Sequence, residues 1–324
     1  MISRSEIQEK IKSLQSARIL LNAKIESLGM AIKQIDEEIA AQTGNLDRVS
    51  LSIQENPYWK RPDTRDIAEF FAAKDFFIAD LMEISPKNQK DKHELANAAW
   101  KYYDLINPVF KKLAKEKDRF EYDFPDNGTP AGKSVFGQTM KRLGDLKLIS
   151  YERKKNHYAI SPTDDITGEW KLFFDGIWAE YVARALIESA IRTCQSKNPL
   201  NYGIWSNVKL KRIDSSKPYD MELDVVVNLR NDKIKKHHIY IFEIKSGRNW
   251  RVDRWIDSAR LFQDHLKKNV RFITCCTDSD IDPMIFAPYR LCSLQNIEKQ
   301  MAEFLRLDFS SDKEKLKETP KTKK

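Results

Sequence analysis

Three charged residues interrupt two apolar segments near the middle of the chain. Asp224 lies within MELDVVV (residues 221–227), and Glu243 and Lys245 lie within YIFEIKSG (residues 240–247). Charged side chains are costly to bury in a strand unless each has a partner. A structural explanation must therefore supply ion partners for all three. A chemical explanation is that the two carboxylates hold a cation and the lysine acts beside it.

The spacing of these residues brings them together on one surface. Two β-branched runs, 221–229 and 238–245, are joined by a short charged turn and should pair as an antiparallel hairpin. Residues two apart on a strand face the same side, so Glu243 and Lys245 share a face next to Asp224. Two neighbouring carboxylates repel each other unless a cation lies between them. Mg²⁺ (or Mn²⁺) prefers oxygen ligands, acidifies bound water and stabilises charge on a phosphodiester, while Lys245 could neutralise the developing oxyanion.

The alternative is a Glu–Lys ion pair on the surface of an edge strand, because the E-x-K spacing alone is common. The context favours chemistry. Both carboxylates lie inside apolar runs, a predicted helix that carries Glu180 precedes them, and a turn of small residues at Ser246 follows. The next residues begin a strongly basic segment.

The order of these elements resembles the PD-(D/E)XK nuclease superfamily, which has the restriction-endonuclease-like fold, over residues 168–308. The stretches FFDGIWAEYVARAL, MELDVVV and FEIKSG look most like the nuclease domains of CRISPR ancillary effectors. The resemblance implies an α/β domain with a central mixed sheet and a Mg²⁺-dependent endonuclease activity. It implies that Asp224 and Glu243 bind the metal, that Lys245 is the catalytic lysine, and that Glu180 helps to hold the metal site.

Neighbouring residues extend or depart from this pattern. Leu223 stands where the signature has proline. Glu222 shares a strand face with Asp224, so it is either a fourth site carboxylate or a peripheral ion pair, and Asp220 is a weaker substitute.

The segment GRNWRVDRW follows the signature and would overhang the site. Its arginines could hold phosphates, and Trp250 could stack on an unpaired base, whereas Trp255 is more typical of a core position. Gln263 lies where some family members place a supporting glutamine. The arginines concerned are Arg248, Arg251 and Arg254.

Residues 128–161 predict a second nucleic-acid contact. Thr129 is typical of a helix N-cap, the helix should end near Gly144, and strands at 148–153 and 157–161 should form a basic hairpin. A helix followed by such a wing is typical of a winged helix-turn-helix, although these modules also dock proteins. Seven basic residues against two acidic ones favour phosphate contacts, and they are Lys133, Lys141, Arg142, Lys147, Arg153, Lys154 and Lys155.

The N-terminal residues repeat isoleucine and leucine at alternating steps of four and three, which predicts a heptad seam. The a positions hold isoleucine except at Arg18, and this pattern favours a parallel two-stranded homodimer. The alternative is an amphipathic helix folded back on its own chain. Gly44-Asn45 should end the helix. The seam consists of Ile11, Ile25, Ile32 and Ile39 at a, and of Ile7, Leu14, Leu21, Leu28 and Ile35 at d.

The predicted organisation is a multidomain chain. It comprises a coiled-coil dimerisation helix at 1–45, a helical and winged helix-turn-helix domain at 56–163, a nuclease-like α/β domain at 168–308 and a disordered basic tail at 309–324. Further helices are expected at 64–84, 93–118, 170–192, 254–266 and 297–306, and further strands at 203–210 and 270–276.

Composition sets broad limits. The chain has 324 residues, a net charge of +8 and 41% hydrophobic residues, which suits a soluble chain with a mild preference for polyanions. There is no apolar run of about eighteen residues and no signal-peptide pattern, so we expect no membrane segment and a cytoplasmic location. The four cysteines show neither metal-ligand spacing nor a disulfide framework, which indicates a reducing compartment. The adjacent Cys275 and Cys276 are expected to pack as small apolar residues.

Two other motifs do not qualify. DSDID, at 278–282, lacks the glycine of a calcium loop, and GTPAGKS, at 128–134, is one residue short of a phosphate-binding loop.

Together these patterns predict a metal-dependent endonuclease, with DNA favoured as substrate and a role in defence against foreign DNA suggested by the family's habits. A dimer would place two sites on one nucleic acid. The alternatives are a non-catalytic DNA-binding adaptor that uses the winged helix and the coil, and a scaffold that ignores nucleic acid.

Overall fold

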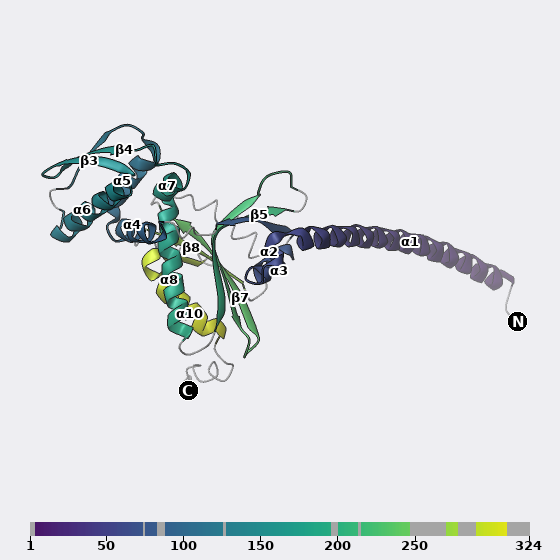
Figure 1. The fold of residues 1–324 in the computed structure, drawn as a ribbon. Coiled ribbons are helices and arrows are strands. Elements are labelled where there is room, and N and C mark those ends of the chain that lie inside the picture. Colours follow the sequence, from purple (N-terminus) through teal and green to yellow (C-terminus); the bar gives the residue numbers. More distant parts are fainter. Residues whose placement is uncertain are drawn as a thin grey trace. The chain divides into compact units, whose positions relative to one another are not determined.

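A computed structural model describes residues 4–73, 75–82, 88–125, 128–195, 200–212, 215–246, 270–277 and 290–309. The chain forms two compact units, Met1–Arg61 and Pro62–Lys324 (Figure 1). No helix among the described residues is long and apolar enough to cross a membrane.

The first unit is dominated by one helix, α1 (Arg4–Glu55), followed by the short α2 (Pro57–Lys60). The prediction that the helix ends at Gly44-Asn45 was wrong, since α1 continues to Glu55. A single glycine costs a helix only about 1 kcal/mol, which the rest of the helix can offset. The described apolar residues of the heptad seam lie on the surface of this helix, between 54% and 66% exposed. They are Leu14, Leu21, Ile25, Leu28, Ile32, Ile35 and Ile39.

The second unit begins with a correction to the expected helix at 64–84. This segment forms a short helix, α3 (Arg65–Ala72), and a strand, β1 (Phe76–Met82). Asp75 adopts a left-handed φ of 62°, which ends the helical path. The aromatic and β-branched sequence that follows pairs antiparallel with a strand far along the chain. The expected 56–163 domain therefore contributes an edge strand to the sheet of the 168–308 domain.

A mixed six-stranded sheet organises this unit, with the order β1-β5-β6-β7-β8-β9. The predicted hairpin is confirmed, since β6 and β7 pair antiparallel from Val225↔Phe242 to Asn231↔Lys236. β8 lies parallel to β7, and β9 lies parallel to β8. The strands are β5 (Asn201–Arg212), β6 (Met221–Asn231), β7 (Lys236–Lys245), β8 (Val270–Cys276) and β9 (Arg290–Ser293).

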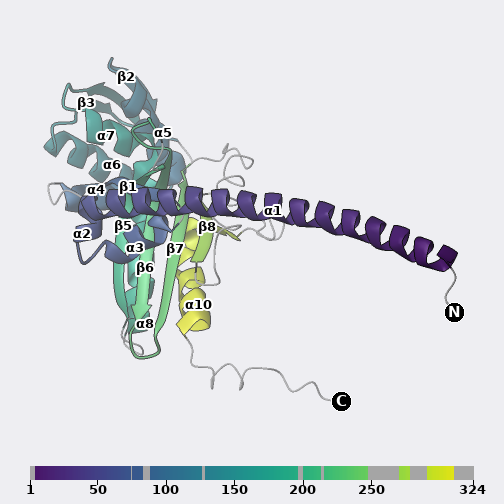
Figure 2. The same cartoon turned by 90° about the vertical axis from the view of Figure 1, so that its right-hand side faces the viewer.

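Helices cover both faces of the sheet. On one face, α8 (Trp178–Gln195) and α10 (Ile297–Phe309) contact each other and β7, as Figure 2 shows for α10. On the other face, the Asn228 side chain of β6 donates a hydrogen bond to Asp66 of α3 at 3.2 Å. Because both faces are covered, β6 and β7 are buried over most of their length, as their apolar runs predict.

The expected helix at 93–118 is two helices, α4 (Gln89–Lys101) and α5 (Tyr103–Lys115), which meet at a non-helical Tyr102 (φ −125°). A three-stranded sheet follows, in the order β2 (Phe120–Asp123), β4 (His157–Pro162), β3 (Ile149–Lys154).

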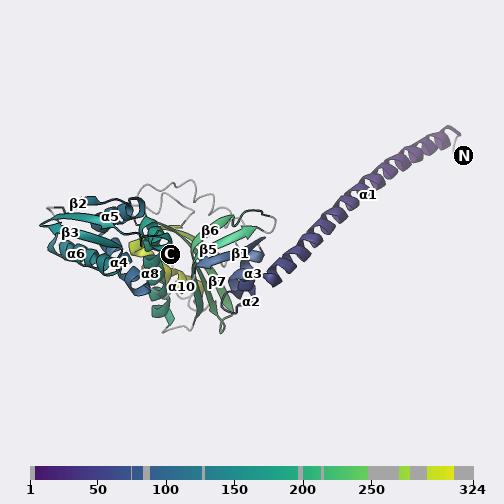
Figure 3. The same cartoon turned by 45° about the horizontal axis from the view of Figure 1, so that its top comes forward.

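Between β2 and β3 lies α6 (Pro130–Asp145), and the predicted cap is confirmed, since the Thr129 side chain accepts from the Gly132 N–H. α4 contacts α8 and α6, so it joins the three-stranded part to the six-stranded sheet (Figure 3).

The predicted burial of Cys275 and Cys276 is confirmed. All four cysteines are free thiols, and Cys275, Cys276 and Cys292 are buried in β8 and β9.

Candidate functional site

The candidate site lies where β6 and β7 separate. Their ladder stops at the pair Val225↔Phe242, although both strands continue toward the site. One step further, the Asp224 carboxylate takes the place of a main-chain acceptor: its Oδ2 accepts the Ile244 N–H at 2.5 Å. Beyond this point β7 pairs, among the described residues, with β8 alone, through Glu243↔Thr274 and Lys245↔Cys276. The sequence thus brings Asp224 and Glu243 together, as predicted.

Lys245 completes this group. Its ammonium donates a hydrogen bond to Glu243, two residues earlier on the same strand face. The Lys245 side chain is 31% exposed and that of Glu243 is 16% exposed, so both reach the surface only in part. The predicted trio of Asp224, Glu243 and Lys245 is therefore assembled at one end of the sheet.

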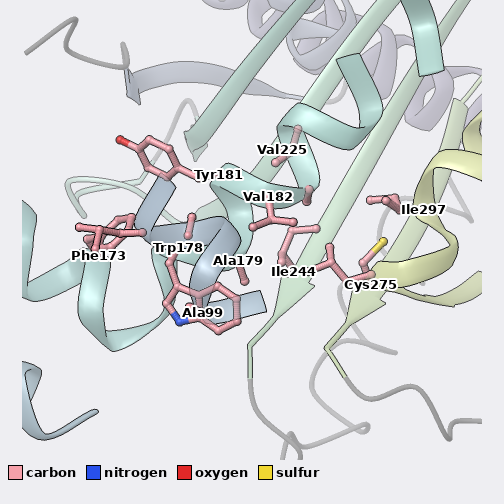
Figure 4. Packing of buried hydrophobic residues seen from close by; sticks show 14 of the residues in the cluster. Ala99, Phe173, Trp178, Ala179, Tyr181, Val182, Val225, Ile244, Cys275 and Ile297 are labelled. Carbon is pink, nitrogen blue, oxygen red and sulfur yellow. The ribbon is translucent and has the colours of Figure 1, made fainter. Parts of the chain in front are cut away.

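α8 brings the fourth predicted residue, Glu180, to the same place. Trp178 and Val182 of α8 are buried in one cluster with Ile244 (Figure 4). This packing holds the first turn of α8 next to the end of β7. Glu180, in that turn, is therefore buried, with 9% of its surface exposed. A carboxylate in the first turn of a helix is also favoured by the helix dipole.

The chain enters α8 through an irregular turn that the sequence did not predict. The expected helix at 170–192 is divided into α7 (Gly168–Leu172), a segment η1 (Phe173–Ile177) that is kinked at Gly176, and α8. Gly176 has φ 157° and ψ −20°, and a Cβ there would lie 2.8 Å from the Ser246 Oγ. Only glycine permits this approach, which joins the start of α8 to the end of β7.

The site has more negative charge than its lysine can balance. Burial, and then the charge of Glu243, raise the pKa of Asp224 to about 7. Burial, followed by the charges of Asp224 and Glu222, raises the pKa of Glu180 well above its usual value. Burial alone would lower the pKa of Lys245, but Glu243 and Asp224 outweigh it and raise the pKa, so this ammonium stays charged at neutral pH.

Asn207 is a site residue that the sequence gave no reason to select. It takes a left-handed φ of 48° within β5, between the pairs Ser206↔Val225 and Val208↔Leu223 with β6. With its nitrogen turned toward the acids, its side chain donates to Glu222 Oε1 at 3.0 Å and to Glu180 Oε2 at 3.3 Å. Glu222 is exposed, so the structure puts it at the rim of the group.

Asp220 lies elsewhere. It accepts hydrogen bonds from Arg212 N at 2.8 Å and Ser215 Oγ at 2.9 Å, which shows that it organises the turn before β6.

A cleft of about 760 Å³ opens beside the carboxylates. Its lining includes Glu180, Ile244 and Lys245 from the site and Tyr103, Asn107 and Lys111 from α5. The Tyr103 hydroxyl donates to the Ser246 carbonyl at 2.9 Å, which fastens α5 to the end of β7. Sequence patterns could not select these α5 residues, because the helix and the strand are more than a hundred residues apart.

The donor set suits a hard divalent cation in its chemistry. Every candidate ligand is a carboxylate oxygen, and burial, followed by the charge of Glu243, raises the pKa of Asp224. Within the described residues, however, no group of three or more His, Cys, Asp or Glu side chains is arranged to hold a metal ion. Ile244 N–H and Lys245 instead occupy one oxygen each of Asp224 and Glu243.

The predicted phosphate-binding residues divide into three groups. Arg248, Arg251 and Arg254, with the neighbouring Trp250, Trp255 and Gln263, lie outside the described residues. On α6, Lys141 pairs with Asp145 at 2.8 Å, Arg142 pairs with Asp91 and Glu94, and Lys133 donates to Asn156. The remaining four are exposed around the β3–β4 hairpin, and they are Lys147, Arg153, Lys154 and Lys155.

Comparison with known proteins adds little. No protein-family model matches the chain, and no curated protein matches it. Among solved structures, the crystal structure of protein VC1899 from Vibrio cholerae is similar, with 15% sequence identity and a TM-score of 0.46. The match covers 75% of this chain and 61% of that one, so the chain spans about three fifths of the length of VC1899. At this TM-score and identity, the likeness establishes neither a fold nor a function.

Proposed function

We propose that the protein is a metal-dependent endonuclease of the PD-(D/E)XK type that hydrolyses phosphodiester bonds, with DNA as the favoured substrate. The single observation that carries this proposal is the end of the β6–β7 hairpin. There Asp224 and Glu243 converge with Lys245, and the charge of Glu180 adds to theirs. A role in defence against foreign DNA is a further expectation from the resemblance.

The site residues would have separate roles in metal binding and in stabilising charge on the phosphate. Asp224 and Glu243 would hold the cation, with Glu180 as a third carboxylate from α8. When bound, Mg²⁺ or Mn²⁺ supplies an acidified water and stabilises charge on the phosphate. Lys245 stays protonated, so its ammonium can bind a phosphate oxygen and stabilise the charge that develops there.

The direct test is incubation of plasmid and single-stranded substrates with Mg²⁺ or Mn²⁺, against EDTA, for the wild type and Asp224→Asn. Asparagine keeps an oxygen for the Ile244 N–H but loses the charge. A matched control is Asp220→Asn, since Asp220 is a nearby carboxylate that lies outside the site. We expect metal-dependent cutting that Asp224→Asn abolishes and Asp220→Asn retains. Uncut substrate in every metal condition would reject the enzyme.

The β3–β4 hairpin and α6 would form a second contact with nucleic acid, as in a winged helix. The exposed cations of the hairpin support this, whereas Arg142 of α6 is committed to Asp91 and Glu94. Its contribution would be binding to phosphates without sequence readout. This arrangement also supports the rival function, a DNA-binding adaptor, which predicts a gel shift that survives Asp224→Asn and no cleavage.

α1 would join two copies of the chain. Its 52 residues span about 78 Å, and an isolated helix that exposes an apolar seam is unfavourable in water. A parallel coiled coil with a second copy would bury that seam. Such a dimer would place two active sites on one nucleic acid.

A further inference from the structure

We infer that the cleft beside the carboxylates binds an unpaired nucleotide next to the phosphate to be cleaved, which makes single-stranded nucleic acid the preferred substrate class. The inference rests on the proposed function and deepens it. The cleft and the catalytic group share Glu180, Ile244 and Lys245 as lining residues. A nucleotide seated in the cleft would therefore have its phosphate beside Lys245. The volume of about 760 Å³ is within the usual range for small-molecule sites.

The walls of the cleft are partly apolar and come from separate elements. Leu172, at the end of α7, lines the cleft and is 56% exposed. Tyr103 of α5 and Ile177 of η1 are half-buried in the same lining. A leucine and a tyrosine in the same lining offer apolar surface that a nucleobase can cover. Stacking and apolar contact of this kind are indifferent to sequence, since every base has a flat face.

One polar group in the cleft lacks a partner. Asn107 of α5 lines the cleft and is only 5% exposed, yet no hydrogen bond joins its carboxamide to any residue in the described part of the chain. In the cleft this carboxamide offers both a donor and an acceptor. This pair of groups matches the edge of a nucleobase, which presents donors and acceptors side by side.

The charges around the cleft separate a base from phosphates. Asp104 and Asp175 contribute carboxylates to the lining, so a run of phosphates would be repelled there. The same carboxylates can accept hydrogen bonds from the amino groups of bases. Lys111 is exposed and has no ion pair among the described residues, which leaves its ammonium available to a flanking phosphate. The cleft therefore suits a neutral base with phosphates at Lys111 and Lys245.

A base stacked in a duplex cannot enter such a cleft unless it leaves the stack, which costs a few kcal/mol. A single strand avoids this cost. The preference can be measured on the full chain, in EDTA, by fluorescence anisotropy of a short labelled DNA oligonucleotide, the RNA of the same sequence, and the duplex form of each. The wild type should bind the single strands more tightly than the duplexes, and the DNA and RNA arms identify the sugar that it accepts.

Two variants test the cleft itself. Leu172→Trp fills it from an exposed position and should not affect folding, and Asn107→Ala removes the unpartnered carboxamide. We expect each to weaken single-strand binding about tenfold. The matched control is Leu307→Trp, an exposed leucine of α10 that does not line the cleft, and it should bind as the wild type does. A second pair of variants tests a cation on α5. Lys111→Ala changes a lysine of the cleft and should weaken single-strand binding, whereas Lys115→Ala changes a lysine that does not line the cleft and should not.

The outcomes separate this inference from the proposed function. If the cleft variants lose single-strand binding but the wild type never cleaves, the cleft inference is supported and the proposed nuclease activity is rejected. If the wild type cleaves with Mg²⁺ but binds duplex as tightly as single strands, or if Leu172→Trp and Asn107→Ala bind like the wild type, the cleft inference is overturned and the nuclease stands.

Discussion

The Asp224 carboxylate accepts the backbone N–H of Ile244 across the gap between β6 and β7 at 2.5 Å. A carboxylate thus occupies a place where a carbonyl of the partner strand would normally lie. This bond orients Asp224 toward Glu243 and leaves one of its oxygens uncommitted to the backbone. It is the feature from which the behaviour of the site can be predicted.

The first prediction concerns pH and stability. Because burial and Glu243 raise the folded-state pKa of Asp224 to about 7, the protonated carboxyl stabilises the folded state. This stabilisation is complete below the unfolded pKa of about 3.9 and is lost as pH rises toward 7. Without metal, the free energy of unfolding of the wild type should therefore fall over this range relative to Asp224→Asn, by about 4 kcal/mol. Urea unfolding in EDTA measures it, and parallel curves for the two proteins would contradict it.

The second prediction concerns Lys245. Lys245→Ala removes the ammonium that can stabilise charge on the phosphate, so cleavage should fall about 10²–10³-fold. Binding of Mn²⁺ should persist or strengthen, because the variant removes a positive charge that now contacts Glu243. Single-turnover cleavage and calorimetric titration with Mn²⁺ measure the two effects. Loss of both together would show that Lys245 maintains the structure of the site and not its chemistry.

The third prediction concerns the approach of η1 to β7. Gly176→Ala should destabilise the protein by about 1–3 kcal/mol, because its φ of 157° suits glycine and the new Cβ would meet the Ser246 Oγ at 2.8 Å. Ser246→Ala removes that oxygen, so the double variant should recover part of the loss. Thermal unfolding of the two single variants and the double variant forms the cycle. Additive effects would mean that backbone strain alone is responsible.

The fourth prediction concerns a buried ion pair at the other end of the sheet. Arg271 Nε donates to Asp308 Oδ2 at 2.6 Å, and the Tyr240 hydroxyl donates to the same oxygen at 2.7 Å. Burial alone would raise the pKa of Asp308, but Arg271 and Tyr240 reverse this and lower it. The pair therefore stabilises the fold above the unfolded pKa of about 3.9 and is lost as pH falls through the folded pKa.

Asp308→Ala should cost about 3–5 kcal/mol at neutral pH, since it leaves the Arg271 charge partly buried without its partner. Urea unfolding at neutral and acidic pH measures the difference, which should shrink as the solution becomes more acidic. A difference that does not change with pH would mean that packing, and not charge, is lost.

The fifth prediction concerns α1. Leu28→Lys places a charge in the apolar seam and should convert a dimer into a monomer, as measured by light scattering after size-exclusion chromatography. Met30→Lys is the matched control, because Met30 is equally exposed, at 69% against 63%, but lies two residues away and outside the seam. A monomeric wild type, or a dimer that Leu28→Lys leaves intact, would show that α1 does not pair two copies.

Local sequence determined the parts of this protein that depend on neighbouring residues. Two β-branched runs around a charged turn were enough to predict the β6–β7 hairpin, because its contacts join residues close in the chain. The strand at Val270–Cys276 and the cap at Thr129 followed from equally local signals. The juxtaposition of Asp224 with Glu243 is a consequence of that hairpin, so it too could be predicted.

Tertiary structure alone decided the rest. Strand pairing overrode the helical periodicity of 64–84, since β1 gains its hydrogen bonds from β5, far along the chain. The same holds for the cleft, where Tyr103 and Asn107 meet the end of β7 only because α5 packs there. Alternation and periodicity describe one element at a time. Which distant elements pack together, and hence which side chains surround the carboxylates, depends on the burial of surface over the whole unit.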